Sequence, residues 1–238
     1  MHATTTIRRF RAAGLAAACT AAVAGAALLG GCAGDPAPAD GTMTREQAQE
    51  LFQSRGPQPG HQLPALHLVD LDGAPADLAA IQKGRPMVLV TASLTCNVAR
   101  RTQPQLEELR RRFGDQVAVV VVYTLEAHPA QDPCPYTGKE WVPESNKKDG
   151  VLVRQPTGLT GRLALAREFQ SRYAPGTTVL VDLMDDAAWK SLGQAPNLGL
   201  LIVGHGMVRM RQGWFDADAM TKELIAIGVK PLPTAPAR

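Results

Sequence analysis

Residues 87–123 read MVLVTASLTCNVARRTQPQLEELRRRFGDQVAVVVVY, and this stretch decides the fold class. Met87–Thr91 and Val117–Tyr123 are continuous apolar runs, which are typical of strands buried on both faces of a sheet. Between them, apolar residues recur at three- and four-residue steps, which predicts an amphipathic helix that ends at Gly114. The stretch therefore predicts a strand–helix–strand unit with two buried parallel strands.

The flanking segments extend this unit. A Gly204-His205-Gly206 turn separates two later strands, and a helix follows them. A βαβ unit followed by an αββα unit predicts an α/β, thioredoxin-like fold with a central mixed sheet flanked by helices. The further expected elements are the helices Thr44–Ser54, Thr160–Tyr173 and Ala217–Ile227 and the strands Leu66–Leu71, Thr177–Val181, Leu198–Val203 and Met207–Arg211.

Composition and charge exclude several classes of protein. The chain has 238 residues, which fits one medium domain with appendages. Its net charge of +3 comes from Arg8, Arg9 and Arg11, so from Cys32 onward basic and acidic side chains balance. This balance argues against nucleic-acid binding. Four cysteines are too few for a disulfide-rich scaffold of this length.

The N-terminal residues predict an export signal. A basic start precedes an alanine-rich apolar stretch, and Leu29-Gly30-Gly31-Cys32 resembles the lipobox of bacterial lipoproteins, whose cysteine is acylated. An ordinary secretory signal and an uncleaved anchor are the alternatives. We expect a lipoprotein signal peptide over 1–31, a lipidated tether over 32–43, the folded domain over 44–230 and a flexible tail over 231–238. The expected location is the bacterial cell envelope, with Cys32 as the lipid anchor and Ala33 favouring the outer membrane.

Cys96 is the candidate nucleophile. It lies where the first apolar strand gives way to a helix, between Thr95 and Asn97, and the free N–H groups of a helix start stabilise a thiolate. We therefore predict a Cys96 pKa below the ordinary thiol value. A buried structural cysteine is the alternative. Ala99 rules out a CxxC pair and Arg100 a CxxxC metal motif.

A histidine and a glutamate follow the second apolar strand, in Tyr123-Thr124-Leu125-Glu126-Ala127-His128-Pro129. Parallel neighbouring strands place their carboxyl ends at one edge, so Glu126 and His128 are expected beside Cys96. Histidine exchanges protons near neutral pH, and a carboxylate orients it or takes a proton. The alternative is a loop histidine beside a solvated glutamate.

Leu94-Thr95-Cys96, the Tyr123–Pro129 motif and Val181-Asp182-Leu183-Met184 together resemble the iodothyronine deiodinase family. The resemblance covers roughly Pro64 to Trp214. It implies a thioredoxin-like fold with a peroxiredoxin/deiodinase-like insertion and an oxidoreductase activity. In the animal enzymes a selenocysteine stands in the place of Cys96, and the glutamate and histidine of the motif serve catalysis.

This chain departs from the animal enzymes in two places. Pro156 stands where that family has a histidine thought to grip the hormone, and Trp214 follows Gly213 where an arginine is expected. The stretch 132–142 looks closer to bacterial deiodinase-like redoxins. The resemblance therefore implies a thiol oxidoreductase whose substrate is a small halogenated or oxidised molecule rather than a thyroid hormone.

Cys134 is the candidate resolving thiol. Prolines on both sides of it favour an extended, exposed loop that meets a partner thiol, and an unpaired loop cysteine is the alternative. Asn97 and Thr95 are candidate support residues of the site.

The remaining candidates carry weaker signals. Trp141 is a candidate pocket wall or an ordinary core residue, and Pro196 a candidate cis-proline beside the thiol or a plain turn proline. His61, His67 and His205 have no metal-ligand spacing and are predicted to be exposed. No metal and no cofactor are predicted.

Three functions remain open at the level of sequence. The first is a deiodinase-like redoxin. The second is a peroxiredoxin-like peroxidase, although the Pro-x-x-x-Thr-x-x-Cys pattern is absent. The third is a non-catalytic envelope lipoprotein that uses the fold for binding. The expected partners of the first are a small-molecule substrate, a thiol reductant and the membrane through the lipid, with no nucleic acid.

Overall fold

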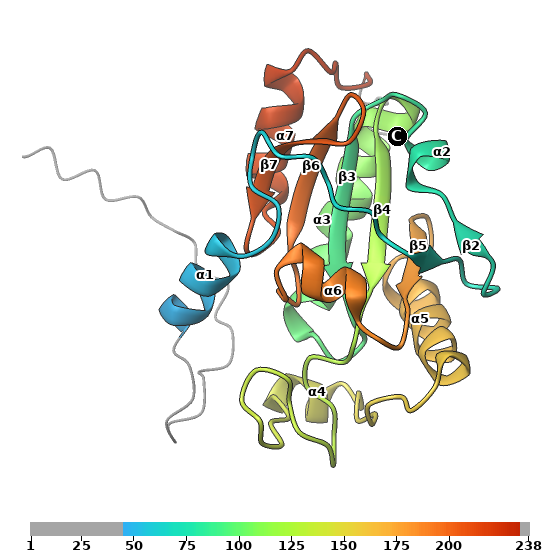
Figure 1. The fold of residues 1–238 in the computed structure, drawn as a ribbon, viewed down its shortest axis with the longest axis vertical. Coiled ribbons are helices and arrows are strands. Elements are labelled where there is room, and N and C mark those ends of the chain that lie inside the picture. The colour runs from blue at the N-terminus through green and yellow to red at the C-terminus, as the bar shows by residue number, and fades with distance from the viewer. Residues whose placement is uncertain (1–44, 234–238) are drawn as a thin grey trace, which may run out of the picture. The chain divides into compact units, whose positions relative to one another are not determined.

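The computed structural model describes residues 45–233, which form one seven-stranded mixed sheet with helices on both faces (Figure 1). The strand order is β2-β1-β5-β4-β3-β6-β7. The elements are α1 (Arg45–Ser54), β1 (Leu68–Val69), β2 (Pro75–Ala76), α2 (Leu78–Gln82), β3 (Met87–Ala92), α3 (Asn97–Phe113), a 3-10 turn (Gly114–Gln116), β4 (Ala118–Tyr123), α4 (Glu144–Lys148), α5 (Leu159–Tyr173), β5 (Thr178–Asp182), α6 (Ala187–Leu192), β6 (Gly199–Val203), β7 (Met207–Gln212) and α7 (Ala217–Ala226).

The predicted strand–helix–strand unit is confirmed at the centre of the sheet. β3 and β4 pair in parallel from Met87↔Ala118 to Ala92↔Tyr123, and every residue of both strands is buried. α3 connects them and ends at Gly114, as predicted, with Pro104 inside the helix. The carboxyl ends of β3 and β4 therefore lie side by side at one edge of the sheet.

The second half of the fold is antiparallel. β6 pairs with β3 on the side away from β4, and β7 pairs with β6 across the predicted 204–206 turn. α7 follows as expected and packs against α3. A βαβ unit joined to a ββα unit in this order is the thioredoxin-like fold, so the predicted fold class is confirmed.

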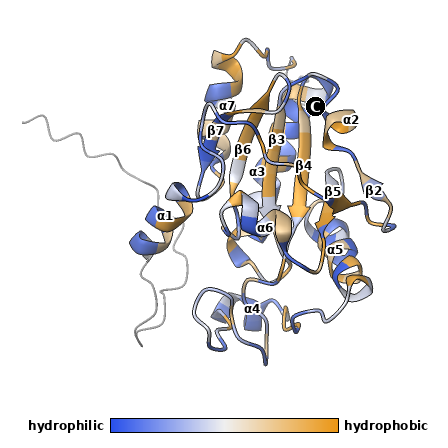
Figure 2. Ribbon diagram, viewed as in Figure 1, coloured by the Kyte–Doolittle hydropathy of each residue, from blue (hydrophilic) through white to orange (hydrophobic). Residues whose placement is uncertain are grey.

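Two apolar layers fill the space between sheet and helices. α3, α5 and α7 contribute to the core on one face, whereas α1, α2 and α6 contribute to the other. Figure 2 shows β3 and β4 apolar along their length and α4 mostly hydrophilic. Continuous apolar strands are the expected partners of two such layers, because both of their faces are removed from water.

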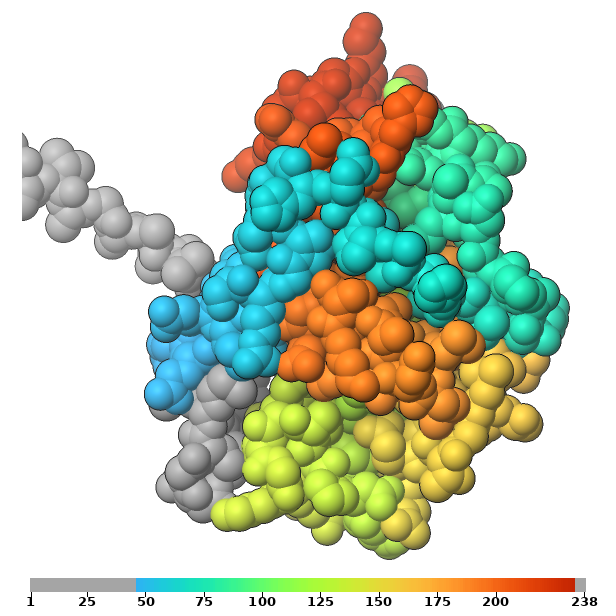
Figure 3. All heavy atoms as spheres, in the orientation of Figure 1, coloured from blue at the N-terminus to red at the C-terminus, as the bar shows by residue number. Residues whose placement is uncertain are grey.

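The sequence between β4 and β6 forms α4, α5, β5 and α6, and β5 extends the sheet in parallel with β4. We call its first part, residues 124–158, the 124–158 segment. This segment contains α4 and lies beyond the carboxyl ends of β3 and β4 (Figures 1 and 3).

The predicted strand Leu66–Leu71 is shorter than expected. Only Leu68 and Val69 pair as β1, and they form a hairpin with β2 around the Asp72-Gly73 turn. Three short helices, α2, α4 and α6, were not predicted from sequence, because five or six residues contain too little of a helical period. Across residues 45–233, no helix has the length and apolar content needed to cross a membrane.

Candidate functional site

Cys96 lies at the N-cap of α3, directly after the loop that follows β3. Its Sγ accepts a hydrogen bond from the Ala99 amide at 3.3 Å, which is the predicted helix-start environment. The predicted low pKa is wrong, however. The residue is 1% exposed, and burial raises the pKa of the Cys96 thiol to about 11. The amides of Ala99 and Val98 and the charge of Arg100 lower it, but desolvation is the larger effect.

Glu126 is fully buried and holds the residue that precedes Cys96. Its carboxylate accepts hydrogen bonds from the Thr95 amide at 2.8 Å and from the Thr95 Oγ1 hydroxyl at 2.7 Å. The Tyr123 hydroxyl donates a third hydrogen bond to it. Burial raises the pKa of the Glu126 carboxyl, while these donors oppose the shift. Gln155 fixes the Glu126 backbone by pairing with both its N–H and its carbonyl.

His128 is buried beside the same loop. Its amide donates to Thr95 Oγ1 at 3.0 Å, and its ring meets the Trp141 ring edge-on with centroids 4.6 Å apart. Thr95 therefore connects Glu126, His128 and Cys96, because its side chain contacts the first two and its backbone adjoins the third. The fold brings together the three residues predicted to lie at one edge of the sheet.

Residues 93–96 connect β3 to α3, and we call them the thiol loop. Side chains from outside this loop hold its backbone. The Leu94 amide donates to the Tyr123 hydroxyl at 3.1 Å, and the Leu94 carbonyl accepts from Arg100 Nη1 at 2.8 Å. The Thr95 carbonyl accepts from Asn146 Nδ2 at 2.8 Å. Sequence reasoning missed Tyr123, Arg100 and Asn146. The position of Tyr123 at the end of an apolar strand was a signal for the first, whereas nothing in the sequence pointed to Asn146.

α4 also contacts the start of α3. Asn97 Nδ2 donates to Ser145 Oγ at 3.0 Å, next to the Asn146 contact with the loop. Two adjacent residues of α4 thus hold the start of α3 and the thiol loop, in addition to the bonds from Glu126 and His128 to Thr95.

The predicted exposure of Cys134 is wrong. Pro133 and Pro135 are exposed, but the thiol between them is buried and its pKa is raised by that burial. A tight loop causes this: the Cys134 amide donates to the Lys139 carbonyl at 2.9 Å and the Gly138 amide donates back to the Cys134 carbonyl at 2.9 Å. Both Cys96 and Cys134 are free thiols in this structure.

Tyr136 is a further residue that the sequence analysis missed. Its phenol is close enough to both Cys96 and Cys134 for either thiolate to oppose its ionisation, although burial is the larger reason for its raised pKa. Its ring packs edge-on against Phe52 and Trp189, with centroids 5.7 and 6.3 Å away. The two thiols therefore share one aromatic neighbour.

Pro196 is not a cis-proline, since residues 45–233 contain no cis peptide bond. It is buried in the loop before β6, where Thr91 Oγ1 donates to the Ala195 carbonyl at 2.9 Å and accepts from the Leu198 amide at 2.8 Å. These bonds fix the loop against the end of β3, and the predicted cis peptide bond at Pro196 is not needed for this.

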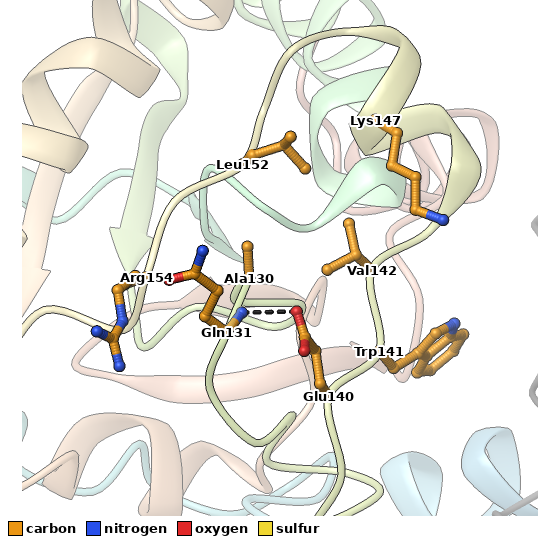
Figure 4. A pocket seen from close by; sticks show the side chains of 8 residues that line it. All are labelled: Ala130, Gln131, Glu140, Trp141, Val142, Lys147, Leu152 and Arg154. Carbon is orange, nitrogen blue, oxygen red and sulfur yellow. Dashed lines mark hydrogen bonds between the residues drawn. The ribbon is translucent and has the colours of Figure 1, made fainter.

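An open pocket of about 670 Å³ lies in the 124–158 segment (Figure 4). Trp141 lines it, and the same indole contacts His128, so its role as a wall of the thiol site stays a prediction. A hydrogen bond from the Gln131 amide to Glu140 Oε1 at 2.7 Å crosses it. The pocket is bounded by residues other than Cys96 and Cys134. Its lining is Ala130, Gln131, Glu140, Trp141, Val142, Lys147, Leu152 and Arg154.

The described part of the chain holds no group of three histidine, cysteine or acidic side chains that could bind a metal. His61, His67 and His205 are exposed, as predicted. Cys32 and the rest of the predicted leader and tether lie outside the described residues.

The family described as iodothyronine deiodinase matches residues 42–218, which is more than half of the chain. A search of curated proteins found no match.

Several solved structures are similar to the chain at low identity. A putative protein disulfide isomerase from Bacteroides thetaiotaomicron is 14% identical, with a TM-score of 0.49 and coverage of 73% of this chain and 91% of that one. A thiol peroxidase from Chromobacterium violaceum is 17% identical, with a TM-score of 0.45 and coverage of 72% and 88%. An exposed lipoprotein thioredoxin from Streptococcus pneumoniae is 17% identical, with a TM-score of 0.43 and coverage of 68% and 98%.

Proposed function

The chain belongs to the iodothyronine deiodinase family, and we propose that it is a thiol-dependent reductase in which Cys96 attacks a small halogenated or oxidised substrate. The family and the fold indicate an oxidoreductase that uses thiol chemistry. One observation carries the finer proposal. Cys96 lies at a helix start, and the preceding residue, Thr95, is hydrogen-bonded to Glu126 and to the His128 amide.

The reaction transfers two electrons from sulfur. With an organic iodide, the Cys96 thiolate takes the iodine, the carbon takes a proton, and the products are R–H and a sulfenyl iodide. The Cys134 thiol then attacks this sulfur, which releases iodide and a proton and forms a Cys96–Cys134 disulfide. An external thiol reductant returns both residues to the reduced state. Glu126 and His128 are the proposed proton carriers.

Burial sets a condition on this chemistry. A thiol with a pKa of about 11 is almost entirely protonated at neutral pH. Because Cys96 is buried, the structure around it must open before a substrate reaches it, and we expect the same opening to hydrate the thiol and lower its pKa. Bridging to Cys134 requires that the two Cα atoms come within about 7 Å of each other.

The test uses the full chain, reduced and anaerobic, with an iodinated phenol, an iodothyronine and hydrogen peroxide in separate arms. Iodide release, peroxide loss and the modification of each cysteine are measured by electrode, colorimetry and mass spectrometry. We expect iodide release from the phenol that Cys96→Ser abolishes. Peroxide loss alone would replace the proposal with a peroxidase. If no arm modifies Cys96, the non-catalytic binding role is correct.

Cys134→Ser separates the two thiols. We expect this variant to complete the first attack and to accumulate oxidised or substrate-bound Cys96, without the intrachain disulfide that the parent protein forms. If the parent consumes Cys96 while Cys134 stays free, an external thiol reduces the intermediate and Cys134 has no resolving role.

A further inference from the structure

Arg100 is a buried cation on the first turns of α3. Its side chain is 4% exposed, and its guanidinium makes three hydrogen bonds. Nη1 donates to the Leu94 carbonyl at 2.8 Å, and Nη2 donates to Asn146 Oδ1 and Asp149 Oδ2, each at 3.0 Å. The Arg100 amide also donates to the Cys96 carbonyl at 3.1 Å. Arg100 therefore touches the thiol loop on one side and α4 with its C-cap on the other.

We propose that Arg100 is a positioning residue for Cys96, and that Asp149 determines how much of its positive charge acts on the thiol. The inference rests on the proposed function only in taking Cys96 as the reactive thiol. Neither residue carries a signal in the sequence, and neither belongs to the Cys96, Glu126 and His128 set.

The geometry supports a charge effect in addition to a packing role. Arginine remains protonated in proteins, so its charge is permanent. In this buried position water screens it weakly, whereas the Asp149 side chain is 49% exposed. The shift in the Cys96 pKa agrees in sign, since Arg100 lowers it and Glu126 raises it.

The ionisable groups on the elements around the thiol are Arg100 on α3, Tyr123 on β4, Glu126, His128, Cys134 and Tyr136 in the 124–158 segment, and Arg162 and Tyr173 on α5, with Asp149 behind Arg100. Arg100 and Arg162 are the permanent cations in this set. Arg100 is the one that contacts the thiol loop and lowers the Cys96 pKa, whereas the charge of Arg162 acts on Glu126. Removing the charge of Arg100 and removing that of Asp149 should therefore act on Cys96 in opposite directions.

Two substitutions test the proposal by the direction in which each shifts the apparent pKa of Cys96. Arg100→Gln should raise the apparent pKa of Cys96 and slow its alkylation at neutral pH on the order of tenfold. Asp149→Asn leaves the Leu94 and Asn146 bonds of Arg100 in place, and it should lower that pKa and speed alkylation roughly two- to fivefold. A residue that only fastens α4 would give changes of the same sign in both variants.

The experiment measures alkylation of Cys96 by iodoacetamide in the full chain across pH, resolved by mass spectrometry. The midpoint of the pH profile gives the apparent pKa of the Cys96 thiol, and the plateau at high pH gives the accessibility of the thiolate to iodoacetamide. Glu144→Gln is the matched control. It removes one negative charge from α4 at a side chain that is 79% exposed and paired with Lys147, and its midpoint should stay at the parent value.

Opposite midpoint shifts in Arg100→Gln and Asp149→Asn support the proposal. A change of plateau alone, or a midpoint in Asp149→Asn equal to that of Glu144→Gln, overturns it. If Arg100→Gln does not fold, Arg100→Lys keeps the charge and should keep the parent midpoint, while Asp149→Asn still tests the sign. Because alkylation needs no substrate turnover, these shifts can appear even if the proposed reductase activity is absent.

Discussion

The buried carboxylate of Glu126 lowers the stability of the folded protein, and we expect it to serve the reaction instead. Its carboxylate is completely buried, and its raised pKa means that the folded protein disfavours the charged form. The three hydrogen bonds from Thr95 and Tyr123 compensate only in part. An uncharged side chain of the same shape would fit this position at a lower cost, so the carboxylate is retained for another reason, which we take to be proton transfer.

Glu126→Gln should therefore separate stability from activity. Above the ordinary glutamate pKa of 4.5 the unfolded chain gives up a proton that the folded protein retains, so wild-type stability falls as pH rises through the folded pKa. Relative to wild type, the variant should gain stability between pH 4 and pH 7 in urea titrations. Its turnover should fall on the order of 10²–10⁴-fold. A relative loss of stability over the same pH interval would contradict this account.

Cys96 gives a second pH dependence with the same sign. Its folded pKa is about 11 and its reference value 9.0, so the unfolded chain loses its proton first as pH rises. Between pH 9 and 11 the wild type should lose up to about 2 kcal/mol of stability relative to Cys96→Ala. Parallel denaturant titrations of both proteins measure the difference, and a constant difference across this interval would show that the thiol is hydrated in the native state.

A property of a site residue could be predicted only where the neighbouring sequence determines it. Cys96, Glu126 and His128 could be placed because each follows a strand whose apolar run is continuous. The thiol pKa and the exposure of Cys134 were wrong because both depend on the 124–158 segment, which has no apolar period from which its packing could be derived. A proline-flanked position constrains the backbone but does not fix the direction of its side chain.

At the scale of elements, the sequence was informative wherever an element contains its own pattern. β3 and β4 are continuous apolar runs and α3 repeats a helical apolar period, and their bounds agree with the prediction within two residues. α6 has only six residues and depends on Asp182, whose carboxylate accepts from the Ala188 and Trp189 amides at its start. The start of this helix is thus stabilised by the last residue of the preceding strand, β5, and its own six residues do not predict it.

The contact between the end of α1 and the end of α6 can be tested with two glycines. Gly56 has φ +78, and a Cβ there would lie 2.4 Å from the Leu192 carbonyl oxygen, whereas Gly60 has φ +86 and open space around it. Alanine at either position strains the backbone, but only Gly56→Ala forces two backbones apart. We expect Gly56→Ala to lose roughly 1–3 kcal/mol more than Gly60→Ala in urea denaturation. Equal losses would mean that α1 adjusts without cost.

At the scale of the whole molecule, the prediction that concerns Cys32 is that its acylation attaches the protein to a membrane surface. Cys32→Ala should prevent acylation, so the protein should move from the detergent phase to the aqueous phase in phase partitioning of cell extracts. Ser54→Ala, an exposed position on α1, is the control and should partition like the parent. Unchanged partitioning of Cys32→Ala would remove the lipoprotein prediction and leave the fold and the site as described.

The way in which the thiol loop is held has a consequence for protein engineering. The groups that hold Leu94 and Thr95 include Tyr123, Glu126 and Asn146, which lie 29, 31 and 51 residues away in the chain. A transplant of residues 93–98 alone into another thioredoxin-like scaffold would thus carry the cysteine without its environment. The smallest portable unit is the one that runs from β3 through α4, and a recipient would need to accept it as a single block.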